Sequence, residues 1–528
     1  MSVLERQAPS ATASSTPARP RRWLGPVAIG ALGVVLSAFL SWQPSIWYDE
    51  AATISATGRS WPQLWSLLAH VDAVHGLYYG GMHLWFDLVG YTPFTLRLPS
   101  ALATGATGAL TVLLVRRLVT GRIAVLAGLL LELLPRITWA GAEGRSYAAT
   151  ALLAVALTTL FVTACRSTRA RWWVAYGLLA ALSTVFFAYL ALIVAAHGVT
   201  AALTWWAARR DGSPPTGAGR SAARSLGCWA AASASAAALV LPFAAVVVAQ
   251  SGQVSWIDPI GATTLRGILV TQLFYKNPPF AAVGWTLVAL GTVLLAVRAV
   301  RQSRAQPTRQ EVSPPGPSLL AITLPWIVVP TIGLLVASAL VSPLYSPRYL
   351  TFVAPAAAAL MAVAVAALRR RRLIAVVIAA SVALALPQYL EQRAPEAKQE
   401  STWSDVAELV SSERSSEPMS TPQAVIYGPV RRHATATTRV IAVSYPDAFA
   451  GLIDVRLKTP AAETGRLWET RYPLEQVTSR LDEASVVWLI TSTKQDWRPS
   501  VTRTLEGLGY RVDSEWAFTG VTVTRYRR

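Results

Sequence analysis

The stretch Trp42-Gln-Pro-Ser-Ile-Trp-Tyr-Asp-Glu50 decides the fold, because it follows the first long apolar run and ends in two adjacent carboxylates. Residues 23–41 carry no charge and are long enough to cross a bilayer as a helix. An arginine-rich cluster at residues 19–22 precedes them, and such clusters stay in the cytoplasm. Asp49 and Glu50 are therefore predicted to emerge on the opposite, outer face of the membrane.

The composition is that of a polytopic membrane protein. Of 528 residues, 53% are hydrophobic and 14% are charged, which is too apolar for one soluble core. The net charge of +19 falls in short basic clusters between apolar runs, as in cytoplasmic loops, and does not indicate nucleic-acid binding. Cys165 and Cys228 are too few for a disulfide framework or a thiolate metal site. Residues 1–22 are rich in Ser, Ala, Thr and Pro, and are predicted to form a disordered cytoplasmic tail.

Alternating apolar runs and basic clusters predict about eleven transmembrane helices, with the N-terminus in the cytoplasm and the C-terminus outside. The segment from Leu77 to Val89 is short and carries His83 and Asp87, so residues 60–70 and 76–90 are predicted as amphipathic helices on the outer surface. The least regular crossing contains Glu132 and Arg136. The predicted crossings are 23–41, 98–115, 123–141, 146–164, 172–188, 190–208, 226–249, 280–297, 318–341, 350–368 and 373–387.

A change of composition near residue 390 indicates a second domain. Residues 23–388 are predicted to form the transmembrane unit, with an outer loop at 42–94, and residues 389–528 a soluble extracytoplasmic α/β domain. This domain has no phosphate-binding glycine loop or nucleophile elbow, so its expected role is support or acceptor contact. Its predicted strands are 424–428, 440–443, 486–491 and an edge strand at 521–526, and its predicted helices are 402–412 and 499–508.

The predicted outer face gathers acidic, imidazole and cationic side chains. A carboxylate there can accept a proton from an attacking hydroxyl, and an arginine or lysine can neutralise a phosphate leaving group. His75 and Asp72 are candidate ligands for a divalent ion such as Zn, Mn or Mg. The outer-face residues are Asp49, Glu50, Asp72, His75, His83, Glu143, Arg145, Lys276 and Arg348, with Tyr78, Tyr79, Tyr147, Tyr275, Tyr345 and Tyr349 around them.

Five short motifs carry a family resemblance. They are Asp49-Glu50, Asp72-Ala-Val-His75-Gly-Leu-Tyr-Tyr79, Leu96-Arg-Leu-Pro-Ser-Ala-Leu102, Glu143-Gly-Arg-Ser-Tyr147 and Ser346-Pro-Arg-Tyr-Leu350. Their order and spacing over residues 20–390 resemble the GT-C membrane glycosyltransferases, in particular the protein O-mannosyltransferase and aminoarabinose transferase branch, glycosyltransferase family 39-like. The chain departs from this pattern at His75-Gly76-Leu77, where relatives usually have His or Lys followed by proline.

The resemblance implies an inverting transfer of one sugar, expected to be mannose, from a polyprenyl-phosphate donor to an acceptor at the bacterial plasma membrane. The acceptor would be a glycan, a lipid or a protein on the outer face. By resemblance, Asp49 is the base that deprotonates the acceptor, Glu50 shapes its loop, and Glu143 is a second acidic residue across the cavity. The implied donor-phosphate ligands are Arg348, Lys276, Arg145 and Tyr345.

Three other hypotheses fit the same pattern. The sugar is an arabinose-type pentose in one, and in another the chain is a polyprenyl-lipid transporter or flippase without enzymatic activity. A transporter needs polar residues at bilayer depth, whereas here the ionisable residues lie at the ends of the spans, except Glu132 and Arg136. In the third, the chain is a scaffold with a degenerate site.

Overall fold

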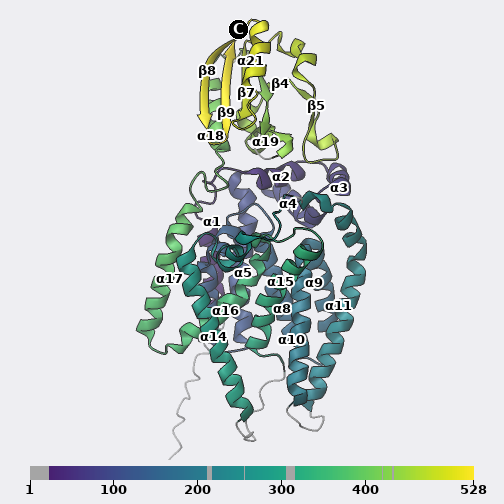
Figure 1. Cartoon of the computed structure of the whole chain (residues 1–528), viewed down its shortest axis with the longest axis vertical. Coiled ribbons are helices and arrows are strands. Elements are labelled where there is room, and N and C mark those ends of the chain that lie inside the picture. The colour runs from purple at the N-terminus through teal and green to yellow at the C-terminus, as the bar shows by residue number, and fades with distance from the viewer. Residues whose placement is uncertain (1–22, 211–216, 255, 305–315, 419, 431–432) are drawn as a thin grey trace, which may run out of the picture.

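The computed structural model describes residues 23–210, 217–254, 256–304, 316–418, 420–430 and 433–528. These residues form a long helical bundle with an α/β domain at one end, and the C-terminus lies at the far end of that domain (Figure 1). The predicted tail at residues 1–22 lies outside the described residues, as do parts of the loops at 209–224 and 301–317.

Helices occupy all eleven segments predicted to cross the membrane. They are α1 (Leu24–Ala38), α5 (Pro93–Arg116), the pair α6 (Gly121–Leu133) and α7 (Pro135–Gly141), α8 (Tyr147–Cys165), α9 (Arg171–Phe186), α10 (Ala191–Arg210), α11 (Gly217–Ala249), α14 (Pro278–Arg304), α15 (Leu319–Leu340), α16 (Ala354–Ala367) and α17 (Arg371–Glu391). Among the described residues, eight helices are long and apolar enough to cross a membrane, and the bent pair would be a ninth. The helices α1 and α9 are shorter, with 15 and 16 residues. The chain is a multi-pass membrane protein.

The irregular segment at 123–141 is broken by a bend of 67° between α6 and α7. Pro135 is the first residue of α7, where its missing N–H breaks no helical hydrogen bond, and Leu134 before it is extended. Arg136 follows at once and donates hydrogen bonds to the carbonyl oxygens of Thr271 at 2.5 Å and Gln272 at 3.3 Å. The polar interruption in the sequence therefore marks the bend.

The helix α16 forms the centre of the bundle, because every residue from Ala354 to Val365 is buried. Its alanine side chains are small, so that α6 and α14 pack closely against it. The contact with α14 is tightest at Gly291, where an added Cβ would collide with the carbonyl group of Leu360. This packing fixes the segment that precedes α16, the 3-10 helix η5 (Pro347–Val353).

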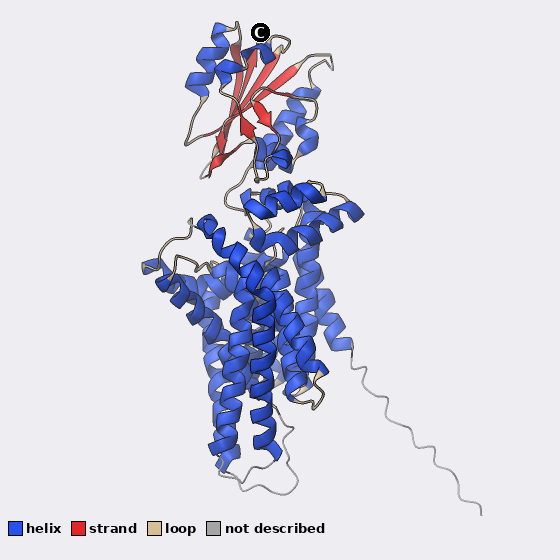
Figure 2. Cartoon of the chain, turned by 90° about the vertical axis from the view of Figure 1, so that its right-hand side faces the viewer, coloured by secondary structure: helices blue, strands red, loops and turns tan. Residues whose placement is uncertain are grey.

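Short helices close the end of the bundle that faces the C-terminal domain (Figures 1 and 2). Two of them, α3 and α4, occupy the segments predicted as surface helices, and the described residues add a π-helical turn at 267–271. The short elements are α2 (Tyr48–Thr57), α3 (Trp61–His70), η1 (Ala73–His75), α4 (Gly76–Val89), η2 (Ala188–Leu190), η3 (Ser251–Val254), α12 (Ala262–Arg266) and α13 (Gln272–Phe274).

The described part of the C-terminal domain has a five-stranded mixed sheet in the order β4 (Ile453–Asp454), β1 (Gln423–Tyr427), β7 (Val486–Ser492), β9 (Val521–Arg527) and β8 (Arg511–Phe518). Strands β4, β1 and β7 are parallel, and β9 pairs antiparallel with β7 and β8. Alternate residues face opposite sides, so Val425 packs toward α18 and α2 whereas Ile426 packs toward α21. The remaining elements are α18 (Trp403–Ser415), β2 (Pro429–Val430), β3 (His433–Thr437), α19 (Arg439–Ser444), α20 (Pro446–Phe449), β5 (Leu457–Thr459), η6 (Ala461–Glu463), β6 (Thr470–Arg471), η7 (Leu474–Gln476), η8 (Thr478–Leu481) and α21 (Arg498–Gly507).

Two sequence predictions for this domain were wrong. The apolar run 440–443 is part of helix α19, because Val440, Ile441 and Ser444 form one buried helical face in the core shared with α2. The strand predicted at the edge is β9, which lies between β7 and β8. An alternating pattern does not distinguish an edge strand from a central strand. Here the residues on both faces of β9 are buried, as its central position requires.

Candidate active site

Helix α2 presents the two adjacent carboxylates. It begins at Tyr48 after Trp47, whose backbone is extended, so Asp49 and Glu50 both lie in its first turn, where the helix dipole stabilises negative charge. Their surroundings differ, because the side chain of Asp49 is 22% exposed and that of Glu50 is fully buried. Only Asp49 is therefore accessible to a substrate.

Glu50 is held by a dense set of donors. Arg97 binds it in a bidentate ion pair at 2.9 and 2.6 Å, and the backbone N–H of Gly144 donates to it at 2.8 Å. Burial favours the neutral acid, but the charges of Arg97 and Lys398 and these hydrogen bonds lower the pKa of Glu50 to about 2. Because Arg97 also donates to the carbonyl oxygens of Ser41 and Pro44, Glu50 ties the start of α2 to the preceding loop.

Glu143 lies beside Glu50, in the loop between α7 and α8. It accepts hydrogen bonds from the indole Nε1 of Trp47 at 2.6 Å and from the Nζ of Lys398 at 2.5 Å. Burial raises the pKa of Glu143 against the attraction of Lys398, and the charge of Glu50 acts in the same direction as burial. Glu143 is fully buried and contacts Trp47 rather than Asp49, so it supports the loop that leads to Asp49.

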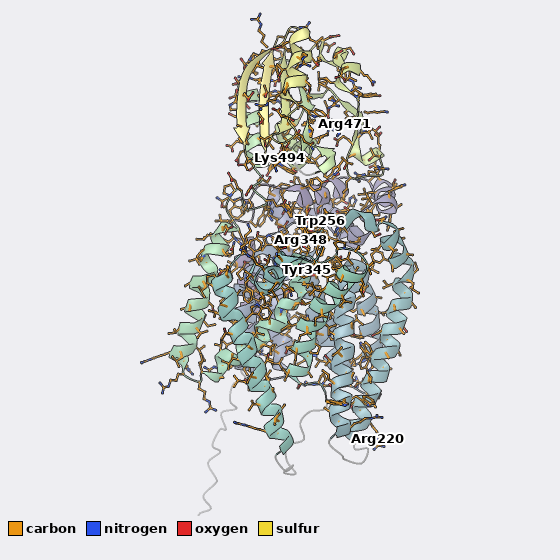
Figure 3. All side chains as sticks on the ribbon, in the orientation of Figure 1. Arg220, Trp256, Tyr345, Arg348, Arg471 and Lys494 are labelled. Carbon is orange, nitrogen blue, oxygen red and sulfur yellow. The ribbon has the colours of Figure 1, made fainter. Side chains whose placement is uncertain are left out.

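Asp49 forms an ion pair with Arg348 of η5, with 3.0 Å between Oδ2 and Nη1. The guanidinium of Arg348 lies against the rings of Trp256 and Trp47, at 4.9 and 5.7 Å from their centroids. Its buried Nε atom has no hydrogen-bond partner among the described residues. Figure 3 shows Trp256, Arg348 and Tyr345 close to the junction of the bundle and the C-terminal domain.

Arg145 organises the residues on the other side of Asp49. Its guanidinium donates to the carbonyl oxygen of Asp49 at 3.2 Å and to the hydroxyl of Tyr79 at 3.2 Å, and Tyr79 donates to Asp72 at 2.8 Å. Burial raises the pKa of Asp72, while the charge of Arg145 opposes this change. Arg145 thus holds the backbone of Asp49 through one guanidinium nitrogen and contacts His75 through another.

The two ring nitrogens of His75 differ, because its buried Nδ1 atom has no hydrogen-bond partner among the described residues whereas Nε2 is occupied. The Nη2 atom of Arg145 lies 2.9 Å from Nε2 of His75, so a guanidinium cation occupies the position of a metal at that nitrogen. Burial lowers the pKa of His75 well below its usual range, and the charges of Arg145 and Arg348 add to this effect. Within the described residues, no three His, Cys, Asp or Glu side chains form a group that suits a metal ion. A divalent metal at His75 and Asp72 stays a prediction, and the steps below are derived from the side chains of the chain alone.

Two predicted phosphate ligands do not contact the Asp49 group among the described residues. Lys276 is exposed, and its Nζ atom lies 5.7 Å from the ring of its neighbour Tyr275. Tyr345 is buried and donates to the side-chain oxygen of Gln272 at 3.3 Å. The structure thus brings Asp49, Arg348 and Arg145 together, whereas the contacts found for Lys276 and Tyr345 are with other residues.

Comparisons with known proteins bear on the fold and on the family likeness of the chain. The family description "Dolichyl-phosphate-mannose-protein mannosyltransferase" matches residues 81–210. The fold is similar to that of ArnT from Cupriavidus metallidurans bound to undecaprenyl phosphate, with a TM-score of 0.56 at 14% identity over 94% of this chain and 97% of that chain. The same protein in the apo state gives a TM-score of 0.53 at 14% identity, again over 94% and 97% of the two chains. No sequence among the curated proteins matches the chain.

The chain has the GT-C fold of the membrane glycosyltransferases. This confirms the resemblance inferred from the five motifs and the predicted fold class. An oligosaccharyltransferase from Archaeoglobus fulgidus, solved with Zn and sulfate, is a more distant match, with a TM-score of 0.45 and 12% identity over 95% of this chain and 72% of that chain.

Sequence reasoning missed two cations of this GT-C site. Arg97 was within a quoted motif, and a charged residue that falls inside an apolar helix was a signal that it has a buried partner. Lys398 had no such signal, because it lies in a polar segment after the last span and reaches Glu143 across 255 residues of sequence. The buried cluster therefore contains two carboxylates, Glu50 and Glu143, and two cations, Arg97 and Lys398.

Proposed function

We propose that the chain is an inverting glycosyltransferase that moves a single sugar from a polyprenyl-phosphate donor to an acceptor hydroxyl on the outer face of a bacterial plasma membrane. The observation that carries this proposal is the ion pair between Asp49 and Arg348. It sets a proton acceptor beside a cation that retains an unpaired N–H, at the end of an apolar helical bundle. The matching family description also names a lipid-phosphate sugar donor, and the ArnT structure of similar fold is bound to undecaprenyl phosphate, a lipid phosphate without a sugar.

The chemistry follows from the positions of these groups. The acceptor oxygen attacks the anomeric carbon of the donor, its proton passes to the carboxylate of Asp49, and the bond from that carbon to the phosphate oxygen breaks. The departing polyprenyl phosphate keeps the electron pair, and Arg348 stabilises its charge. Attack opposite the leaving group inverts the anomeric configuration. Arg145 holds the backbone of Asp49 in place during this step.

Mannose is the proposed sugar, since the matching family description names a mannosyltransferase. An arabinose-type pentose is the alternative within the same fold. Purified protein should be incubated with polyprenyl-phosphate mannose and, separately, with polyprenyl-phosphate arabinose, together with membrane and cell-wall acceptors. Transfer of mannose supports the full proposal, and transfer of the pentose alone corrects the sugar. Accumulation of flipped lipid without transfer would favour the transporter hypothesis.

The substitution Asp49→Asn tests the role of the base. Asparagine keeps the size of the side chain but cannot take the proton, so we expect turnover to fall by a factor of about 10²–10⁴. The matched control is Asp87→Asn, whose side chain is 66% exposed and lies on α4. Wild-type turnover in the Asp49 variant would refute this assignment.

A further inference from the structure

The Nζ atom of Lys398 lies at the centre of the buried charge cluster. It is 2.5 Å from Oε2 of Glu143 and 3.3 Å from Oε1 of Glu50, and it donates to the carbonyl oxygen of Ala142 at 2.9 Å. With Arg97, it balances the two carboxylates, so the cluster is neutral as a whole. A buried charge is tolerated only when it is paired in this way.

Lys398 comes from residues 392–402, the segment that joins α17 to α18 of the C-terminal domain. This segment is fixed to the loop before α2 by several hydrogen bonds. The backbone N–H of Ser45 donates to the carbonyl of Pro395 at 2.8 Å, and the hydroxyl of Ser401 donates to the carbonyl of Ile46 at 2.7 Å. The segment and the loop that leads to Asp49 are therefore one packed unit.

The backbone next to Lys398 is strained. Gln399 and Glu400 have φ angles of 55° and 58°, in the left-handed region that non-glycine residues rarely occupy. Two such residues in succession persist only where the surrounding contacts hold them, and such strain is concentrated at functional sites. Here it turns the chain immediately after the buried lysine, so that Ser401 reaches Ile46.

A chain of contacts leads from Lys398 to the base. Lys398 holds one carboxylate oxygen of Glu143, and the other accepts the indole N–H of Trp47 at 2.6 Å. Trp47 is the residue before α2, and its ring also lies under the guanidinium of Arg348. The orientation of Glu143 thus bears on both members of the ion pair between Asp49 and Arg348.

We infer that Lys398 is a positioning residue for the transfer reaction: it fixes Glu143 and, through Glu143 and Trp47, the turn that presents Asp49 to the substrate. The segment that leads into the C-terminal domain is therefore part of the active site. This inference rests on the proposed function for its kinetic test, and it has a second test that does not depend on activity.

The kinetic test is a double-mutant cycle of Lys398→Met and Glu143→Gln, with the exposed Lys494→Met as the control. We expect Lys398→Met to lower kcat at least tenfold with little change in donor KM, because Lys398 is buried whereas Arg348 is the proposed phosphate ligand. Glu143→Gln leaves one excess positive charge, whereas the double variant is neutral again and its introduced glutamine still accepts from Trp47. The double variant should therefore be several-fold faster than Glu143→Gln alone. Equal or slower turnover of the double variant would overturn the inference, whether or not the lysine variant folds.

The second test measures backbone hydrogen exchange of residues 45–57 by mass spectrometry. Exchange there should be faster in Glu143→Gln than in the wild type, and slower again in the double variant. Unchanged exchange in all variants would overturn the positioning role. If exchange changes as expected but the protein transfers no sugar, the positioning role of Lys398 stands and the proposed function is rejected.

Discussion

At the scale of single residues, Asp49 and Glu50 are adjacent in the chain but have different surroundings. Asp49 is partly accessible and faces one guanidinium, whereas Glu50 is fully enclosed by Arg97, Lys398 and the N–H of Gly144. A base has to exchange a proton with a substrate, which a buried bidentate carboxylate cannot do. Glu50 is therefore a structural anion that holds Asp49 in position.

Arg348 provides the residue-scale prediction for donor binding. Replacing it by alanine removes a charge-assisted contact to phosphate, and such a contact contributes about 1.5–3 kcal/mol of binding free energy. We therefore expect donor kcat/KM to fall roughly 10- to 150-fold. The control is Arg266→Ala, an exposed arginine in the short helix α12. Steady-state transfer at varied donor concentration measures the effect. An unchanged donor kcat/KM in the Arg348 variant would exclude it as a phosphate ligand.

Glu50 provides a prediction for stability. The substitution Glu50→Gln leaves Arg97 buried without its carboxylate, and breaking such a pair costs about 3–5 kcal/mol. We expect a lower thermal unfolding midpoint at neutral pH, measured in detergent. The control Glu506→Gln, at an exposed position in α21, should behave like the wild type. A wild-type midpoint for Glu50→Gln would show that the ion pair adds no net stability.

The same pair predicts a dependence of stability on pH. Folding lowers the pKa of Glu50 from 4.5 to about 2, so its ionised form is favoured in the folded state. Its contribution is fully present above pH 4.5 and is lost as the pH falls toward 2, on the order of 3 kcal/mol in total. The free energy of unfolding of the wild-type protein should fall by this amount on acidification, whereas that of Glu50→Gln should not. If the free energy of unfolding of the two proteins changed equally between pH 4.5 and pH 2, the lowered pKa of Glu50 would be contradicted.

At the scale of secondary structure, apolar runs predicted all eleven helical segments of the bundle, because each helix must cover its length with apolar side chains in a membrane. The site was only partly predictable. The predicted outer-face loops and the family resemblance made Asp49 and Arg348 candidates, and the structure pairs them, but the sequence could not show that Tyr345 turns toward Gln272. Nor could it identify Lys398, whose role arises only when a distant segment folds back on the start of α2.

The bend between α6 and α7 makes an element-scale prediction. Arg136 donates to two carbonyl oxygens of residues 271–272 and stacks on Trp139 and Tyr275, with 4.8 and 5.1 Å between its guanidinium and the ring centroids. Replacing it by methionine leaves these buried carbonyls without donors, at a cost of about 1–3 kcal/mol each. The thermal midpoint should fall, whereas Arg301→Met, at an exposed position near the end of α14, should not change it. Equal midpoints would show that the bend is stable without Arg136.

At the scale of the whole molecule, the C-terminal domain and the site, marked by Arg348 and Trp256, share one end of the bundle (Figure 3). Direct hydrogen bonds join them: Trp468 donates to the hydroxyl of Tyr48 at 2.7 Å, and Tyr91 donates to the carbonyl of Ser444 at 2.7 Å. The core of the domain also continues into α2. The domain and Asp49 must therefore lie on the same side of the membrane, whichever side that is.

This constraint sharpens the prediction of topology. Eleven crossings from a cytoplasmic N-terminus place the C-terminus outside, so alkaline phosphatase fused after Arg528 should be active, because it folds only outside the cytoplasm. The control fusion after Arg169, in a predicted cytoplasmic loop, should be inactive. An inactive Arg528 fusion with full expression would mean that the C-terminus lies in the cytoplasm, either because α1 does not cross the membrane or because the whole chain has the opposite orientation. Since the domain packs on α2, Asp49 would then also face the cytoplasm, and the proposed transfer on the outer face would have to be abandoned with it.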